Sequence, residues 1–175
     1  LYGAYDEQCQ REGVVDFAEL LLRAYELLQR NQPLRQHYQQ RFRHILIDEF
    51  QDTNDLQYRW LTLLAGGGAS LFAVGDDDQS IYAFRGANVG NMAAFERDYA
   101  GPQLIRLEQN YRSHAHILDS ANHLIRQNAH RLGKDLWTDA GEGEPVRIFA
   151  AFSDRDEAQW LLEEIRALVA DGMSR

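Results

Sequence analysis

Two groups of acidic residues directly follow short apolar segments of this chain. Asp48 and Glu49 follow the apolar run 45–47, and the three aspartates at 76–78 follow the run 71–74 after a single glycine. Each run is typical of a short strand buried on both faces, so the acidic groups would leave neighbouring strands at their carboxyl ends. In open parallel sheets this edge is the ligand-binding edge.

A strand that ends in Asp-Glu carries two groups that a nucleotide hydrolase needs. Asp48 would hold Mg²⁺, and Glu49 would orient or deprotonate the attacking water. Acidic residues are common at strand ends, however, so the pair alone is more often structural. The aspartates at 76–78 are equally ambiguous, because neighbouring carboxylates repel one another and usually form a solvated or metal-bound turn.

The segment that begins at Gln79 adds two further kinds of chemistry. The neutral amide of Gln79 can donate to a terminal phosphate and accept from water, so it can respond to a γ-phosphate. Tyr82, Phe84 and Arg85 place two aromatic rings and a guanidinium within four residues. Aromatic rings stack on bases at roughly 1 to 3 kcal/mol per base, and arginine adds backbone or cation–π contacts. Packing in the core is the alternative for the two rings.

Tyr111 and Arg112 lie between a predicted strand at 104–107 and a predicted helix capped by Ser113. An arginine at this position would reach a γ-phosphate as an arginine finger, and the tyrosine ring would stack on a purine. A plain surface arginine is the alternative for Arg112.

Helices with recognisable start signals accompany these segments in the first half of the chain. Asp16 is a predicted N-cap, with Glu19 as its capping-box partner. Pro33 interrupts the helical pattern that follows. Asn54 is predicted to begin a second helix, which the glycines at 66–68 end.

The second half of the chain alternates between strand and helix patterns. The run 146–151 is a predicted strand, and Ser153 with Asp156 forms a capping-box start to a helix that reaches about Ala170. Together with the strand at 104–107, this alternation predicts an α/β fold with a parallel sheet.

The composition of the 175 residues is that of a globular protein, with 45% hydrophobic and 26% charged residues. Apolar runs are too short to span a bilayer, and the start at Leu1 has no signal-peptide pattern, so we expect a cytoplasmic protein that does not enter membranes and whose start is a cut. The net charge of −9 argues against nucleic acid, but residues 80–134 carry seven basic and four acidic side chains.

Two long motifs make the function more specific, namely residues 48–54 (DEFQDTN) and 74–87 (VGDDDQSIYAFRGA). With residues 15–21, 107–113 and 133–138 they resemble the superfamily 1 DNA helicases of the UvrD, PcrA and Rep group. The likeness extends over essentially the whole chain. Residues 48–54 resemble motif II of that family, 74–87 motif III and 107–113 motif IV.

The resemblance implies a role in ATP hydrolysis for five residues. Asp48 would hold Mg²⁺, and Glu49 would activate the attacking water. Gln79 would couple the γ-phosphate to the DNA site. Tyr111 would stack on the adenine of ATP, and Arg112 would be the arginine finger.

The resemblance also implies contacts with single-stranded DNA through Tyr82, Phe84 and Arg85. The family usually has tryptophan where Phe84 stands, so stacking should persist on a smaller ring. Members of the family hydrolyse ATP to move 3′ to 5′ along one strand and to unwind duplex. The implied partners are single-stranded DNA, single-strand/duplex junctions, and repair or replication proteins, with DNA repair as the implied process.

The implied fold is a set of partial RecA-like P-loop NTPase domains with a piece of an inserted helical subdomain. Residues 1–42 would be the helical end of that subdomain, 43–107 part of the first RecA-like domain with motifs II and III, and 108–175 the start of the second with motif IV. The phosphate-binding pattern G-x-x-x-x-G-K followed by Ser or Thr does not occur, because the only Gly-Lys pair is Gly133-Lys134. We therefore expect this segment to be inactive alone, as part of a larger ATP-dependent helicase.

Other classes of protein share some of these features. A related helicase-nuclease subunit or another superfamily 1 translocase would carry the same motifs. A DNA-binding or scaffold segment without catalysis would keep the fold, but it has no chemical need for Asp48, Glu49, Gln79 and Arg112. An acidic metal nuclease is the weakest alternative, since it needs a basic residue beside its carboxylates and no lysine lies near residues 76–78.

Overall fold

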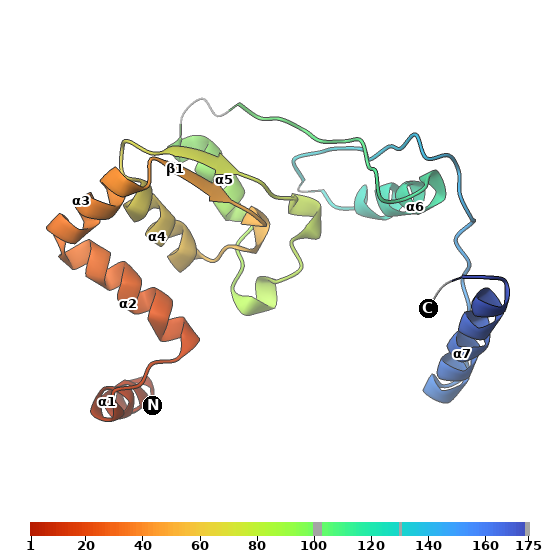
Figure 1. Cartoon of the computed structure of the whole chain (residues 1–175), viewed down its shortest axis with the longest axis horizontal. Helices are drawn as coiled ribbons and strands as arrows, with labels where there is room; N and C mark the ends of the chain where they lie inside the picture. Colours follow the sequence, from red (N-terminus) through yellow and green to blue (C-terminus); the bar gives the residue numbers. More distant parts are fainter. Residues whose placement is uncertain (100–102, 130, 174–175) are drawn as a thin grey trace. The chain divides into compact units, whose positions relative to one another are not determined.

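The structure is a computed structural model that describes residues 1–99, 103–129 and 131–173 (Figure 1). Its internal contacts divide the chain into two compact units. The first consists of Leu1–Arg106 with Asn128–Gly133, and the second of Leu107–Gln127 with Lys134–Arg175. Residues 128–133 therefore belong to the first unit although both of their neighbouring segments belong to the second.

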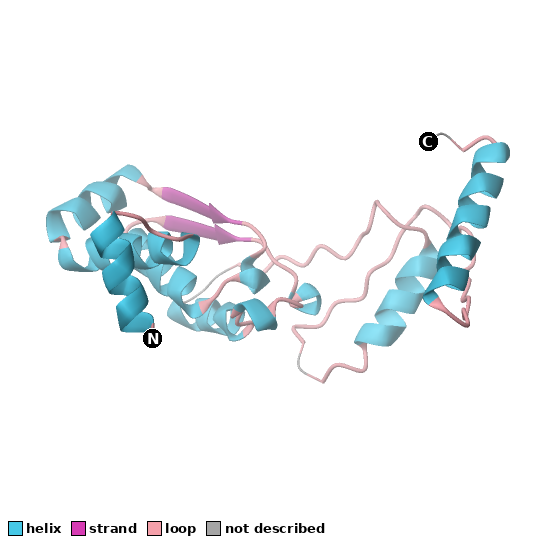
Figure 2. Ribbon diagram, turned by 90° about the horizontal axis from the view of Figure 1, so that it is seen from below, coloured by secondary structure: helices cyan, strands magenta, loops and turns pink. Residues whose placement is uncertain are grey.

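Helices dominate the first unit (Figure 2). They are α1 (Tyr2–Glu12), α2 (Phe17–Arg30), α3 (Gln32–Arg41), α4 (Asp55–Ala65) and α5 (Gly90–Asp98), with short 3-10 turns η1 (Phe50–Asp52), η2 (Asp77–Gln79) and η3 (Ala83–Arg85). The sequence interpretation did not include α1, α3 or α5, and Pro33, which was expected to interrupt the helical pattern, lies in the first turn of α3. Leu28 of α2 and Leu61, Leu64 and Ala65 of α4 are buried and form much of the core of this unit.

The predicted helix starts are largely confirmed. The Asp16 side chain accepts a hydrogen bond from the Glu19 backbone N–H at 2.8 Å. The Glu19 carboxylate does not complete the capping box, because it bonds to the Tyr2 hydroxyl and pairs with Arg23. At α4 the box is complete, since Asn54 and Gln57 each accept from the other's backbone N–H.

Two short strands, β1 (His44–Ile47) and β2 (Ser70–Ala73), pair in parallel with Ile45 opposite Leu71. The prediction that both strands are buried on both faces is wrong. Burial alternates along each strand, and Leu46 and Phe72 are 75% and 57% exposed. Only one face of this sheet is covered in the described part of the chain, and period-two alternation is the result.

The loop after β1 is anchored by aromatic packing. Phe50, three residues after β1, is 2% exposed, and its ring centroid lies 5.3 Å from that of Phe95 in α5. Tyr58 of α4 donates to Asp98 of α5 at 2.9 Å. Burial raises the pKa of Tyr58, and the same hydrogen bond lowers the pKa of Asp98. Helices α4 and α5 are thereby linked beside the carboxyl end of the sheet.

The second unit contains α6 (Ala115–Ile125) and α7 (Asp154–Ala170). The Ser153 cap is confirmed, as is the helix end at Ala170. The α6 helix begins one residue later than predicted, with His114 as its N-cap. The reason is that the Asn110 side chain accepts from the backbone N–H groups of both Arg112 and Ser113, which holds these residues in a turn.

The two strands predicted at 104–107 and 146–151 do not form in the described residues. Both segments are irregular, and the pairing nearest to them is an isolated parallel bridge between Gln109 and Trp137. A strand requires a neighbouring strand for its backbone hydrogen bonds, and neither segment has one. Their apolar side chains are largely exposed, with Leu107 at 78% and Ile148 at 95%.

The fold is therefore a mixed helix and strand structure with a small parallel sheet. This agrees in outline with the predicted α/β class. In the part of the chain that the structure describes, no helix is both long and apolar enough to cross a membrane.

Candidate functional site

The predicted acidic pair lies at the carboxyl end of β1. Asp48 and Glu49 are both exposed, and the Glu49 backbone N–H donates to Asp48 Oδ1 at 2.9 Å. Glu49 has a left-handed backbone with φ 50° and ψ 45°, and it is the single non-glycine residue with positive φ among those described. Conformations of this kind concentrate at functional sites, where the surrounding structure holds them in place.

Gln51 connects this pair to the end of β2. Its side chain is 2% exposed, its Nε2 donates to Glu49 Oε2 at 2.8 Å, and its Oε1 accepts from the Asp76 backbone N–H at 2.9 Å. Gly75 makes this approach possible, because a Cβ there would lie 2.9 Å from Gln51 Oε1. The carboxyl ends of both strands therefore meet around one buried amide.

Gln79 belongs to the same group of residues. It follows β2 in turn η2, and its Nε2 donates to Asp76 Oδ2 at 2.7 Å. The structure thus brings together Asp48, Glu49 and Gln79, which the sequence proposed as candidates from two separate segments.

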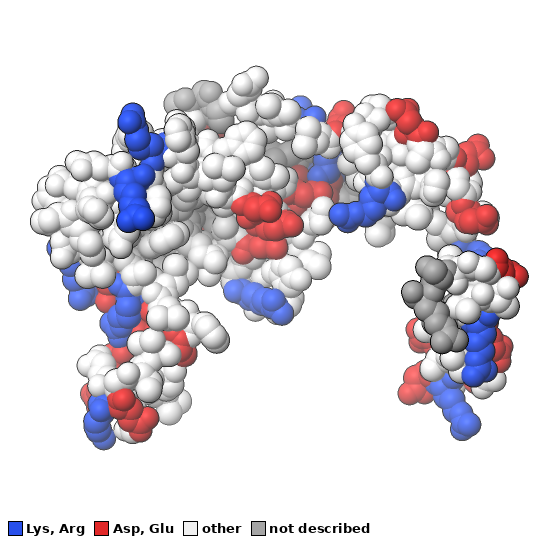
Figure 3. Space-filling view, viewed as in Figure 1, with Lys and Arg blue, Asp and Glu red and all other residues white. Residues whose placement is uncertain are grey.

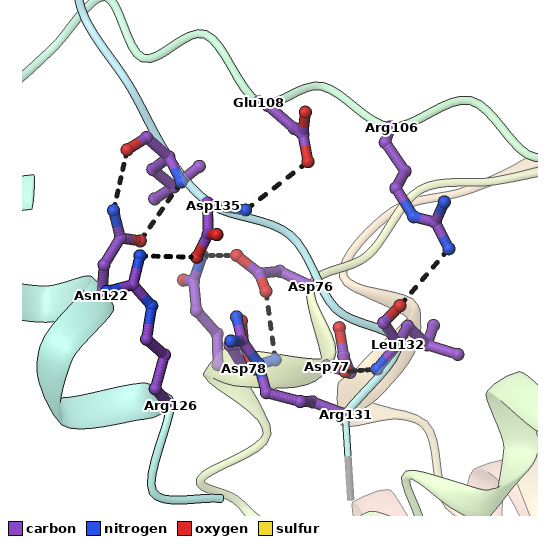
Figure 4. A network of polar contacts seen from close by, with 12 residues as sticks. Asp76, Asp77, Asp78, Arg106, Glu108, Asn122, Arg126, Arg131, Leu132 and Asp135 are labelled. Atoms are coloured by element: carbon purple, nitrogen blue, oxygen red, sulfur yellow. Dashed lines mark hydrogen bonds and ion pairs between the residues drawn. The ribbon is translucent and has the colours of Figure 1, made fainter.

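The aspartates at 76–78 place their oxygens within 4.8 Å of one another, but the protein supplies partners for them. Asp78 forms a bidentate pair with Arg131, at 3.0 Å from Nε and 2.6 Å from Nη2, and Asp77 accepts from the Leu132 backbone N–H at 2.6 Å (Figure 4). This turn serves to anchor Arg131 and Leu132. Sequence reasoning looked for a nearby lysine and missed Arg131, which lies 53 residues away in the chain.

The aromatic segment after Gln79 is a surface cluster. Arg85 lies over both rings, 4.9 Å from the centroid of Tyr82 and 5.4 Å from that of Phe84. Phe84 is 78% exposed and Tyr82 is half-buried, so the core-packing alternative is wrong for Phe84. On the face drawn in Figure 3, basic and acidic side chains form small separate groups.

Tyr111 and Arg112 lie in the second unit and are both exposed. The Tyr111 ring is 85% exposed, and its hydroxyl donates to Gln109 Oε1 at 2.8 Å. Gln109 in turn donates to Asp139 at 2.9 Å. The turn that carries both residues is therefore ordered by hydrogen bonds, while the ring and the guanidinium are free to meet a ligand.

A carboxylate pair after one parallel strand, a glutamine after the next and an exposed aromatic cluster are what a nucleotide-driven nucleic-acid motor requires. Comparison with known families agrees. Residues 1–100 match the UvrD/REP helicase N-terminal domain, and residues 105–175 match the UvrD-like helicase C-terminal domain. The chain belongs to the UvrD/REP helicase family, and the predicted resemblance is confirmed.

Individual relatives support this assignment over nearly the whole chain. DNA helicase II of Escherichia coli (strain K12) is 53% identical over 98% of the chain, which covers 24% of that relative. ATP-dependent DNA helicase UvrD1 of Mycobacterium leprae is 43% identical over 98% of the chain and 23% of the relative. ATP-dependent DNA helicase PcrA of Leuconostoc citreum is 43% identical over 96% of the chain and 22% of the relative. The chain spans about a quarter of the length of these relatives.

Proposed function

We propose that this chain is part of an ATP-dependent DNA helicase that moves 3′ to 5′ along single-stranded DNA and unwinds duplex. The observation that carries the proposal is the hydrogen-bonded link from Glu49 through Gln51 and Asp76 to Gln79, at the carboxyl end of two parallel strands. In this position a base and a γ-phosphate sensor can act on the same nucleotide. The names of the relatives, which include DNA helicase II and ATP-dependent DNA helicase PcrA, support the same activity.

In this proposal Asp48 holds Mg²⁺ and Glu49 activates water. Asp48 is exposed and has one oxygen bonded to the Glu49 N–H. That arrangement suits Mg²⁺, which keeps several waters and binds few protein carboxylates. When bound, the ion would neutralise the charge that develops on the phosphates.

The described residues fit only part of an ATP site. The glycine-rich phosphate-binding pattern does not occur in this sequence, so other parts of the full-length protein must hold the triphosphate. Tyr111 would stack on adenine and Arg112 would be the arginine finger. We propose that residues 43–107 belong to a first RecA-like domain and 108–175 to a second, with 1–42 from an inserted helical subdomain.

The DNA contact is proposed at Tyr82, Phe84 and Arg85. Exposed rings with a guanidinium beside them stack on successive bases without regard to sequence. This suits an enzyme that must move along any single strand and bind single-strand/duplex junctions. By family resemblance, the full-length protein would act in DNA repair in the cytoplasm, together with repair or replication proteins.

The test of this function is DNA-stimulated ATP hydrolysis by the full-length protein, comparing wild type with Glu49→Gln. Removing the base while keeping the shape of the side chain should lower kcat by about 100-fold or more, with ATP binding retained. Glu96→Gln, an exposed change of the same kind on α5, is the matched control and should leave kcat unchanged.

Two outcomes would contradict the proposal. Near-normal turnover in Glu49→Gln would remove the hydrolytic role from this residue and favour a scaffold. Turnover at wild-type rates by the isolated 175-residue chain would show that the nucleotide site is complete without the missing phosphate loop.

A further inference from the structure

We propose that Gln51 is a positioning residue that aims the Glu49 carboxylate and couples it to Gln79. The inference rests on the proposed function, because it assigns a task within the hydrolytic site. Gln51 does not touch the nucleotide in this proposal. It acts through the two residues that do.

The Gln51 side chain is buried, and both ends of its amide are hydrogen-bonded. At 2% exposed it is one of the two most deeply buried large side chains described, together with Phe50. A buried amide is costly unless its donor and acceptor are both satisfied. Here Nε2 donates to Glu49 and Oε1 accepts from the Asp76 N–H, so both ends of the amide have partners.

Only one orientation of this amide allows hydrogen bonds at both of its ends. If the amide were rotated by 180°, its oxygen would face the Glu49 carboxylate and its NH₂ would face the Asp76 N–H. Both contacts would then join like to like, either two acceptors or two donors. The amide is therefore locked, and with it the position of Glu49 Oε2.

The hydrogen bonds continue from Gln51 through Asp76 to Gln79. Asp76 donates its backbone N–H to Gln51 and accepts from Gln79 Nε2 on its carboxylate at 2.7 Å. Glu49 and Gln79 are thus separated by two residues of one hydrogen-bonded chain. A movement of Gln79 on meeting a γ-phosphate would be passed to Asp76 and then to the carboxylate of Glu49.

Backbone hydrogen bonds hold the turn that contains Glu49. A left-handed non-glycine residue persists only where its surroundings hold it. The Phe50 N–H donates to Val74 O at 2.9 Å, and the Asp52 N–H donates to Glu49 O at 2.9 Å, which fixes the turn on both sides. These backbone bonds fix where the chain runs, and Gln51 fixes where the carboxylate points.

Glutamine suits this position better than its isosteres. Glutamate at position 51 would have no donor for Glu49 and would place a second negative charge beside it. Leucine would fill the space but would leave Glu49 Oε2 and the Asp76 N–H without these partners. Gly75 lies close to the amide, because a Cβ at position 75 would be 2.9 Å from Gln51 Oε1.

The experiment compares Gln51→Leu and Gln51→Glu in the full-length protein, with Gln36→Leu and Gln36→Glu as controls at an exposed position of α3. The readouts are kcat and KM for ATP with single-stranded DNA, DNA affinity and Tm. Misaiming a catalytic group by about 1 Å lowers the rate by roughly 100-fold. We expect kcat to fall about 10- to 100-fold in both Gln51 variants, with KM and DNA affinity within about threefold of wild type.

One further measurement separates positioning from general damage. Adding Gln51→Leu to Glu49→Gln should lower kcat by less than about twofold more, because both changes act through one carboxylate.

The outcomes distinguish this inference from the proposed function. If wild type does not hydrolyse ATP, the proposed function fails. If wild type is active, Glu49→Gln is inactive and the Gln51 variants turn over at wild-type rates, the positioning role alone is overturned. Should Gln51→Leu unfold, kcat and KM of Gln51→Glu, measured well below its Tm, decide the question, and a wild-type kcat in that variant contradicts the inference.

Discussion

Glu49 has an unfavourable backbone conformation at the end of β1. A left-handed conformation costs a non-glycine residue about 1 to 2 kcal/mol, and several hydrogen bonds around the turn oppose that cost. The carboxylate is thereby held at the sheet edge before any ligand arrives. Such preorganisation is what a general base requires, since it leaves little to rearrange during the reaction.

Phe84 is the residue at which DNA stacking can be tested most directly. Its ring is 78% exposed, so truncation removes little packing. We expect Phe84→Ala to weaken single-stranded DNA binding by about 5- to 150-fold, which corresponds to the loss of one stacked base. Phe84→Trp should strengthen binding, because its larger ring covers more of a base. Fluorescence anisotropy with a labelled oligonucleotide measures both.

The control for Phe84 is Phe17, an aromatic ring that is 93% exposed at the start of α2. Phe17→Ala should leave DNA affinity unchanged. Equal losses in the two variants would mean that the effect comes from general surface change, and the stacking role of Phe84 would be abandoned.

At the scale of elements, helix starts are the features best predicted from sequence. Asp16, Asn54 and Ser153 each accept a hydrogen bond from the backbone N–H three residues later. This interaction involves only four consecutive residues, so a local sequence pattern is sufficient to predict it. Strands behave differently, because their hydrogen bonds come from another segment.

The capping box at α4 matters to the site because this helix follows turn η1 directly. We expect Asn54→Ala to destabilise the first turn of α4 by about 1 kcal/mol, since it leaves the Gln57 backbone N–H without its acceptor. Hydrogen exchange of that N–H should be about fivefold faster. Asn54→Asp keeps an acceptor at the same position and should exchange nearly as wild type does. Unchanged exchange in Asn54→Ala would show that the cap contributes little.

At the scale of the whole molecule, the chain returns to its first unit after α6. Arg131 and Leu132 lie against the aspartate turn, through the Asp78–Arg131 pair, whose side chains are 12% and 13% exposed, and through the Leu132 N–H. The turn that precedes Gln79 is therefore in contact with a segment distant in sequence. This contact adds a second support to the loop that carries the proposed phosphate sensor.

This contact predicts a large and asymmetric effect of mutation. Arg131→Ala leaves the Asp78 carboxylate largely buried without this partner, so we expect a loss of stability of about 3 kcal/mol. Replacing both residues, with Arg131→Met and Asp78→Leu, should recover most of that loss. Local opening measured by hydrogen exchange at the Leu132 N–H reports the energies. Simple addition of the two single-mutant effects would argue against a coupled pair.

The sequence alone was sufficient to predict the family, the candidate residues and the main helix starts. These depend on residue types at fixed short spacings, as in the segments 48–54 and 74–87. The family is confirmed by comparison, whereas the roles of Asp48, Glu49, Gln79, Tyr111 and Arg112 stay predictions. The strands at 104–107 and 146–151 were predicted wrongly, because an apolar run says nothing about whether another strand lies beside it.

Only the tertiary structure showed the contacts that Gln51 and Arg131 make. Nothing in the sequence singles out Gln51, but the fold places its amide between Glu49 and Asp76. Nothing in the sequence indicates that Arg131 pairs with Asp78, and the fold brings the two side chains together. The Gln51–Asp76 and Asp78–Arg131 contacts join segments 25 and 53 residues apart. Such contacts depend on distance in space, which local sequence spacing does not determine.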